Sequence, residues 1–378
     1  MPMLRYLVVK LVVWTLLAIG LIELFSPREL EVPRAELWAA VASETGPIDT
    51  AIFSPDGRTL ATVDSHGHAE LWDVSSGQRK EVQPIRFDRL RAIAYSPDGR
   101  MLAGGTLDST ILLWNLDDLE VCAEIQLHDK PVNALAFSPD GRMLASAGGD
   151  GALVFWCTVS GTARRFSIGS FSSVIAMAFS PDGTKLATSH LDREVRIRET
   201  ASPGFSTLVA RFSGMARALA FSPDGRVLAS SVMLSSQISR WGPVVDCQRA
   251  TSVGPDSGSP ALAFSPDGCF TVTAGRDGLL QLRDESVDTE WTIPTGHSGR
   301  VWSLAFSPDG RSLITGGNDG VIRLWDVGKL IPLETEKLGL LHFDVQGHGL
   351  ACGESCIDLS FPLQFGPRGI AHDCNTVL

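Results

Sequence analysis

Seven near-identical pentapeptides recur along this chain at an almost constant spacing, and this repeat limits the possible folds more than any other feature. The steps between successive copies are 42, 42, 42, 42, 43 and 42 residues. A fixed period of this length indicates one structural unit repeated seven times. The copies are Phe53–Gly57, Tyr95–Gly99, Phe137–Gly141, Phe179–Gly183, Phe221–Gly225, Phe264–Gly268 and Phe306–Gly310.

The third copy shows what one unit contains. Apolar runs at Val132–Phe137, Met143–Ala147 and Ala152–Trp156 predict three short strands. Arg164–Ile168 predicts a weaker fourth strand. Ser-Pro-Asp-Gly between the first two strands predicts a tight turn, since Pro fixes φ and Gly accepts positive φ. Four antiparallel strands form one blade, so the sequence predicts an all-β, seven-bladed β-propeller of four-stranded antiparallel blades.

A second signature recurs at the end of the third strand of each unit. Trp occupies this position in five repeats, and Asp follows it in the first and the seventh. Repeats four and six carry Arg198 and Arg283 instead. The pattern closely resembles the WD-repeat β-propeller family over roughly residues 36–327. The tryptophans are Trp72, Trp114, Trp156, Trp241 and Trp325.

The resemblance implies a buried His–Ser/Thr–Asp–Trp network in each complete blade. The matching residues have identical spacings of 18, 4 and 6 residues in repeats three and seven. They are His128, Ser146, Asp150 and Trp156 in repeat three, and His297, Thr315, Asp319 and Trp325 in repeat seven. A buried carboxylate needs hydrogen-bond donors, which the imidazole and the hydroxyl supply. Because active sites are few in a protein, a set that recurs in equivalent places favours a structural role over a catalytic one.

Propellers of this family usually bind partners on the rim formed by the starts of the first strands. The position four residues before each pentapeptide aromatic is the matching contact point, and the position two residues earlier lies beside it. These positions vary while the rest of the unit repeats. The predicted partner-binding residues are Asp49, Arg89, Arg91, Asn133, Arg217, Arg300 and Trp302. Arg and Trp are typical of interface hot spots, although a solvated rim is the simpler interpretation of any one of these residues.

These observations favour a non-enzymatic protein–protein interaction scaffold that recognises an acidic segment at this basic rim. The net charge of −11 argues against nucleic-acid binding. No converging carboxylates, phosphate loop or His-rich cluster occur in the repeats, so no cofactor or metal is expected, and a propeller enzyme is the weaker alternative. A structural or envelope role through self-assembly is the third possibility. The sequence leaves the oligomeric state open.

The N-terminus differs in kind from the repeats. Residues Tyr6–Phe25 are almost entirely apolar and long enough for one membrane helix, with charges only at Lys10 and Glu23. We therefore expect a membrane anchor within residues 1–30, with the N-terminus in the cytoplasm and the propeller outside it. A cleaved secretory signal, giving a secreted or periplasmic protein, and a soluble helix are the alternatives. The anchor-plus-propeller layout resembles bacterial members of the family.

Two questions concern the ends of the propeller, predicted at residues 36–327. Glu36–Ala42 is expected to supply the fourth strand of the seventh blade and so close the ring, with Leu330–Thr335 as the alternative. The tail at residues 328–378 lacks the repeat and is most simply a loosely ordered extension. Its three cysteines leave a metal site or a disulfide as alternatives. The cysteines in the blades are expected to be ordinary packing residues: Cys122, Cys157, Cys247 and Cys269.

Overall fold

The structure is a computed structural model, and all the residues that it describes belong to the first of two compact units, residues 1–331 and 332–378. The described residues are 37–42, 46–80, 89–118, 120–167, 172–204, 206–232, 237–241, 248–252, 261–286 and 289–330. The predicted membrane segment at residues 6–25 and the tail beyond residue 330 lie outside them. Within the described ranges, no helix is long and apolar enough to cross a membrane.

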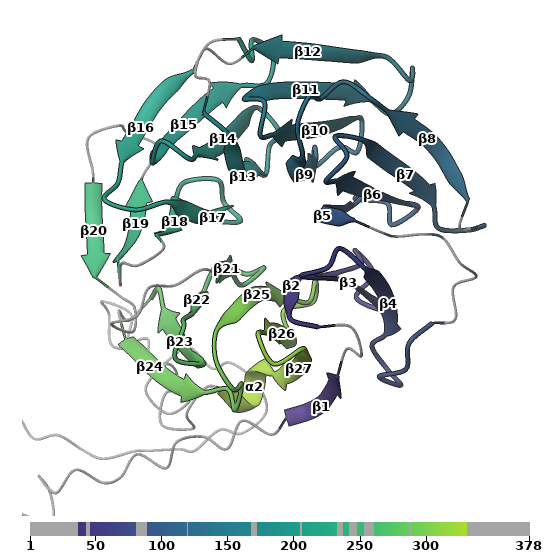
Figure 1. Ribbon diagram of the computed structural model, residues 1–378. Coiled ribbons are helices and arrows are strands. Elements are labelled where there is room, and N and C mark those ends of the chain that lie inside the picture. Colours follow the sequence, from purple (N-terminus) through teal and green to yellow (C-terminus); the bar gives the residue numbers. More distant parts are fainter. Residues whose placement is uncertain are drawn as a thin grey trace, which may run out of the picture. The chain divides into compact units, whose positions relative to one another are not determined.

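Seven antiparallel sheets stand around a common centre, which confirms the predicted all-β, seven-bladed propeller (Figure 1). The first strand of each repeat lies nearest the centre. These inner strands are β2 (Ile48–Phe53), β5 (Leu90–Tyr95), β9 (Val132–Phe137), β13 (Val174–Phe179), β17 (Ala216–Phe221), β21 (Ala261–Phe264) and β25 (Val301–Phe306). The second strands are β3 (Thr59–Asp64), β6 (Met101–Thr106), β10 (Met143–Gly148), β14 (Lys185–His190), β18 (Leu228–Val232), β22 (Phe270–Ala274) and β26 (Ser312–Gly317).

The third and fourth strands extend each sheet outward. The third strands are β4 (Ala69–Asp73), β7 (Ile111–Asn115), β11 (Ala152–Cys157), β15 (Glu194–Glu199), β19 (Gln237–Trp241), β23 (Leu279–Asp284) and β27 (Val321–Asp326). The fourth strands of blades two to six are β8 (Val121–Ile125), β12 (Ala163–Ser167), β16 (Thr207–Arg211), β20 (Gln248–Ser252) and β24 (Thr289–Pro294). In blade one, the described residues form three strands plus an isolated bridge between Trp72 and Arg79.

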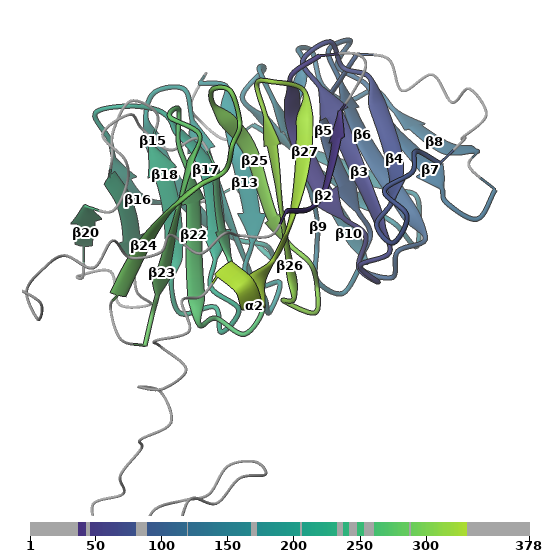
Figure 2. The ribbon, with the colours of Figure 1, turned by 90° about the horizontal axis from the view of Figure 1, so that it is seen from below.

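The N-terminal strand β1 (Leu37–Ala42) closes the ring. It pairs antiparallel with β27, so blade seven has the strand order β1-β27-β26-β25. Figure 1 shows β1 beside the blade that contains β27, and Figure 2 shows β27 and β25 among the blades in the side view. This confirms the first of the two predicted closures. Directly after β27 the chain forms the short helix α2 (Val327–Leu330), and most of the alternative segment, Leu330–Thr335, lies outside the described residues.

Apolar side chains between adjacent blades form the core. At the junction of blades seven and one, Ile48 and Phe53 pack in one cluster with Ile314 and Leu324. The amide of Ala51 also donates to Ser303 Oγ across this junction at 2.8 Å. Because each blade buries one face against the next, the ring behaves as a single core and not as seven separate ones.

The pentapeptides form the same turn in every blade. In the first, Ser54 Oγ donates to Asp56 Oδ1 at 2.5 Å, and the amide of Arg58 donates to the same carboxylate. Gly57 has φ of 70°, a region that favours glycine. A Cβ on Gly57 would stand 3.5 Å from Cδ of Pro308, in the pentapeptide of blade seven. The turns therefore stack blade upon blade and continue across the closure of the ring.

Candidate functional site

The predicted rim positions share one structural property that explains their variability. In six blades the second residue of the inner strand is skipped by the pairing register, as in a β-bulge. A bulge leaves its extra residue without a partner in the strand ladder and changes the direction in which the side chain of that residue points. The side chain of this extra residue therefore does not follow the alternation between the two faces of the sheet that fixes the other side chains of the strand. The six residues are Asp49, Arg91, Asn133, Ile175, Arg217 and Trp302.

All six bulge residues line a single cavity of about 630 Å³, called here the rim cavity. The cavity therefore brings together residues up to 253 positions apart in sequence, from Asp49 to Trp302. Two of the predicted rim residues, Arg89 and Arg300, are not part of its lining. The nearest equivalent in blade six, Pro260, lies outside the described ranges.

A tryptophan and two arginines form the centre of the cationic side. The guanidinium carbon of Arg217 lies 4.6 Å from the centroid of the Trp302 ring, and that of Arg300 lies 4.3 Å from it. Both distances are within the range of cation–π attraction. Arg300 is therefore adjacent to the rim cavity, because its guanidinium contacts the lining residue Trp302. Burial lowers the pKa of both guanidiniums, and Asp49 raises that of Arg217.

The charges at the rim cavity are incompletely compensated. No carboxylate of a described residue lies within 4.0 Å of the side-chain nitrogens of Arg91, Arg217 or Arg300. By contrast, Arg89 Nη1 lies 2.8 Å from Asp108 Oδ1, so the charge of Arg89 is matched. Asp49 is the only acid in the cavity lining. Burial raises its pKa, although Arg217 and Arg91 act in the opposite direction.

The part of the cavity lining that comes from blades three to five contains a group of apolar side chains. Pro131, Ile175, Leu191 and Met215 form this group, called here the aliphatic arc. Leu191 is 55% exposed, so much of its side chain is accessible to a ligand in the cavity. Sequence reasoning passed over Leu191, although it lies in the turn after a second strand. The repeat register would have placed it on the rim beside Gly149 of the preceding blade.

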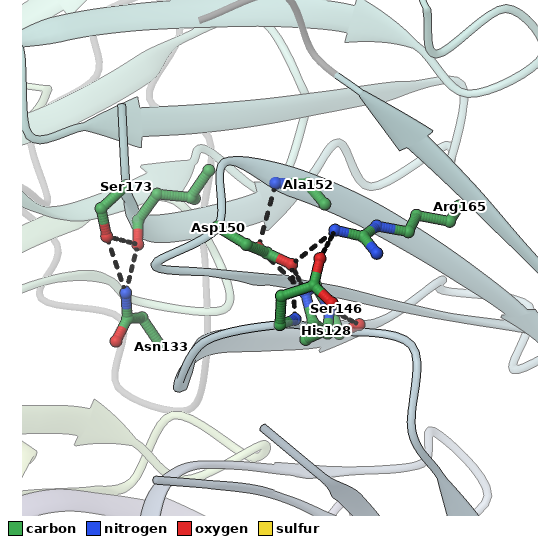
Figure 3. Close-up of polar contacts among 9 residues, drawn as sticks. His128, Asn133, Ser146, Asp150, Ala152, Arg165 and Ser173 are labelled. Carbon is green, nitrogen blue, oxygen red and sulfur yellow. Dashed lines mark hydrogen bonds and ion pairs between the residues drawn. The ribbon is translucent and has the colours of Figure 1, made fainter. Parts of the chain in front are cut away.

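Asn133 lies in the lining but its amide nitrogen is already engaged. It donates to Ser173 Oγ and to the carbonyl of Val174, each at 2.9 Å. Figure 3 shows the amide directed at Ser173. This side chain therefore joins blade three to blade four, and only its oxygen is left for a ligand.

The predicted His–Ser–Asp set of blade three forms a connected network away from the cavity lining (Figure 3). His128 Nε2 lies 2.8 Å from Ser146 Oγ, and His128 Nδ1 lies 3.1 Å from Asp150. Burial lowers the pKa of His128, even though Asp150 raises it, so the neutral imidazole donates from Nδ1 and accepts at Nε2. Arg165 also donates to Asp150 at 3.1 Å. Trp156 packs in the adjacent apolar cluster.

Blade seven has the same arrangement with its tryptophan attached. His297 Nε2 lies 2.8 Å from Thr315 Oγ1, and Trp325 Nε1 donates to the same hydroxyl at 3.1 Å. His297 Nδ1 lies 2.8 Å from Asp319. Burial alone would raise the pKa of Asp319, but hydrogen bonds from His297 and Arg323 lower it to about 2. Thr315 is fully buried and its hydroxyl also accepts from Trp325, so this set connects the turn to the core instead of presenting a hydroxyl to solvent.

The incomplete repeats replace this network with other residues. In blade four, buried Arg198 takes the place of Trp and donates to Thr188 Oγ1 at 2.6 Å. His190 Nε2 lies 3.0 Å from the same hydroxyl. In blade one, Asp64 accepts from the amides of His66 and His68. The sequence already placed Arg198 at the Trp position of repeat four, but its hydrogen bond to Thr188 and the contacts of Asp64 in blade one were not predicted.

The family profile described as IFT122 first beta-propeller, a WD-repeat type, matches residues 47–326. The chain belongs to this family. The match begins one residue before β2 and ends with β27, so it covers the seven inner strands and the bulges that form the rim cavity. A search of the curated proteins found no match. The family match therefore assigns the fold of this chain. It names no ligand, so the ligand must be inferred from the rim cavity.

The cysteines of this WD-repeat propeller correct one expectation. Cys122 and Cys269 are exposed and Cys157 is half-buried, so they are not packing residues of the core. They lie in β8, in the turn before β22 and at the end of β11, where strands meet solvent. Among the described residues, no group of three or more His, Cys, Asp or Glu side chains is arranged to hold a metal ion. Cys247 and the tail cysteines lie outside the described ranges.

Proposed function

We propose that this propeller is a non-enzymatic binding platform that holds an acidic segment of a partner protein over the rim cavity. The observation that carries the proposal is the group of three arginines at or beside this cavity without a carboxylate partner among the described residues. Arg217 and Arg300 are partly buried, so leaving their guanidiniums uncompensated is costly, whereas Arg91 is exposed and free to turn toward a ligand. An acidic ligand would supply the missing charge.

The chemistry of the cavity suits such a ligand. Arginine binds carboxylates through paired N–H donors, and these bonds are roughly twice as strong as neutral ones. Arg217 and Trp302 are of the residue types that dominate binding energy at interfaces. The cation–π contacts hold the guanidinium of Arg217 against Trp302, so less side-chain entropy is lost on binding.

The test combines R91Q, R217Q and W302A in the full chain and measures capture of partner proteins from a lysate of the native cell. We expect the captured set to be lost while the melting temperature is retained. The matched control is R142Q with R311Q, since both arginines are exposed and follow pentapeptides at the opposite ends of β9 and β25. Equal capture by the triple variant and the wild type would contradict the proposal. Capture of the chain alone would instead favour self-assembly.

The location of the propeller forms a separate part of the proposal. The apolar run at residues 6–25 supports a single-pass anchor, and the positive charges before it support a cytoplasmic N-terminus. The propeller would then face the opposite side of the membrane. A topology reporter fused after Leu378 tests this: activity on the cytoplasmic side would overturn the orientation, and a shortened mature chain would indicate a cleaved signal.

A further inference from the structure

The rim cavity is chemically divided, and this division narrows the class of ligand that fits it. Its cationic side consists of Arg91 and Arg217, with Trp302 and the adjacent Arg300. Its other side is the aliphatic arc. A purely acidic segment would neutralise the charges of the cationic side and leave the aliphatic arc exposed to water. A purely apolar segment would leave the guanidiniums uncompensated.

The two sides meet at blade five. Met215 of the aliphatic arc and Arg217 of the cationic side are two residues apart where the chain enters β17, and both line the cavity. Two residues of extended chain span about 7 Å. A ligand that uses both sides must therefore carry its acidic and its apolar group at a similar separation. In an extended peptide this corresponds to side chains one or two residues apart.

We propose that the rim cavity recognises an extended peptide in which an internal Asp or Glu stands one or two residues from an aliphatic side chain. This inference rests on the proposed function and deepens it. The carboxylate accepts N–H donors from Arg217 and Arg91, and the aliphatic side chain packs between Leu191 and Met215. Main-chain groups of the ligand then meet the Asn133 oxygen and the polar groups at the strand starts.

The charge of the site supports this choice over a basic or neutral peptide. Three arginines and one aspartate leave the group with two positive charges in excess. Asp49 is the one acid in the described lining; burial raises its pKa, and the nearby Arg217 and Arg91 lower it. Burial of the exposed aliphatic surface of Leu191 by an apolar side chain of the ligand removes it from water and favours binding.

The test uses capped nine-residue peptides of Gly and Ser with a fluorescent label, measured by anisotropy against the full chain. One peptide carries Glu-Gly-Leu at its centre, and the others carry only the Glu, only the Leu, or Lys-Gly-Leu. We expect the Glu-Gly-Leu peptide to bind at least fivefold more tightly than any other. Equal binding of the Glu-only peptide, or no measurable binding of Glu-Gly-Leu, would overturn the inference. A preference for a free C-terminal Leu over the capped peptide would overturn it too.

Protein variants separate this inference from the function on which it rests. L191S with M215S should reduce the affinity for Glu-Gly-Leu to that for the Glu-only peptide, whereas R217Q should weaken both. V159S is the matched control, because Val159 is 80% exposed and lies beside Thr158, which donates to the carbonyl of Gly141 in the pentapeptide turn. If L191S with M215S has no effect while R217Q abolishes binding, the proposed function stands and the aliphatic arc has no part in it.

Discussion

At the scale of single residues, a β-bulge distinguishes the positions that maintain the blade from the position that can contact a ligand. Six lining residues of the rim cavity, one from each of six blades, are the extra residues of bulges at the starts of the inner strands. The residues on either side of Arg217, for example, are paired with β18 and fixed by the core. Arg217 itself makes no ladder pair and can vary without disturbing the blade. The bulge thus explains why Asp, Arg, Asn, Ile and Trp all occur at one repeat position.

His190 provides a prediction on pH. Burial, and next the positive charge of Arg198, lowers the pKa of His190 from the usual 6.5 to about 4. Below pH 6.5 the unfolded chain binds a proton at this site while the folded chain does not, so stability falls as the pH falls toward 4. The slope for one proton is at most about 1.4 kcal/mol per pH unit. Urea unfolding of wild type and H190Q between pH 7 and 4 should show a shallower loss in the variant, and parallel curves would contradict this.

Cys157 provides a prediction on thiol reactivity. It stands where Asp73 and Asp326 stand in other blades, and like Asp73 it accepts hydrogen bonds from the following turn. The hydroxyl and amide of Ser160 and the amide of Val159 lower the pKa of the Cys157 thiol. Desolvation of the sulfur raises the pKa of Cys122 and Cys269, although both residues are exposed. Because the thiolate is the nucleophile, iodoacetamide should alkylate Cys157 before these two.

Mass spectrometry of the alkylated peptides at pH 7 to 8 measures this order of reaction. The S160A variant should slow the alkylation of Cys157 and leave Cys122 and Cys269 unchanged. Faster labelling of Cys122 or Cys269 than of Cys157 would show that access, and not thiol acidity, decides the order.

At the scale of elements, the blades depend on their turns and on one borrowed strand. The pentapeptide turns repeat the same hydrogen bonds, whereas the opposite turns use different residues in blades one, three and four. The framework therefore tolerates changes in the network, and in blades five and six the equivalent buried hydroxyls of Ser230 and Thr273 have no hydrogen-bond partner among the described residues. The seventh blade, in contrast, takes its outer strand β1 from the other end of the sequence.

The closure gives a prediction on truncation. Deletion of residues 1–42 removes β1 and leaves β27 as an exposed edge, whereas deletion of residues 1–30 keeps β1. Five register pairs join β1 to β27. The longer deletion should lower the free energy of unfolding by about 3 kcal/mol or more, from the lost backbone hydrogen bonds. It should also promote self-association through the free edge.

Urea unfolding and size-exclusion chromatography measure these two effects, with the shorter deletion as the control. The comparison uses two soluble truncations, so removal of the apolar N-terminal run is common to both. If both truncations unfold at the same midpoint and elute as the same species, β1 is not the strand that secures the ring.

At the scale of the whole molecule, an acidic protein carries a locally basic cavity. The net charge is −11, yet the rim cavity and Arg300 together hold three arginines and one aspartate. The Debye length is about 10 Å at 0.1 M salt, so a bound ligand senses the cavity and little of the distant surface. The charge of the whole chain therefore says little about the charge of its ligand.

The charge of the cavity gives a prediction on salt. The affinity for the Glu-Gly-Leu peptide should fall several-fold between 100 and 500 mM NaCl, because salt screens partly exposed charge pairs. The R217Q variant should show a weaker dependence, since one of the interacting charges is gone. Anisotropy titrations at four salt concentrations measure this. An affinity that rises with salt would indicate binding through the aliphatic arc alone.

The sequence predicted much of the fold and part of the candidate site. In the third repeat β9 has the predicted bounds, β10 and β11 each end one residue later than predicted, and β12 lies one residue earlier than the predicted fourth strand. Five of the seven predicted rim residues line one cavity. Arg89 is instead paired with Asp108, and Arg300 lies behind Trp302. Leu191 was recognised as a lining residue only in the structure, and so were the burial of Arg198 and its hydrogen bond to Thr188.

By itself, the sequence determined that this chain is a seven-bladed propeller and which positions vary around it. Strand period, turn residues and the 42-residue repeat are local properties, and each can be read from a short stretch of chain. Only the tertiary structure decided which strand closes the ring, which charges remain uncompensated and which side chains share a cavity. Those relations join residues from different blades, and their distances depend on how seven sheets pack around one centre and not on neighbouring sequence.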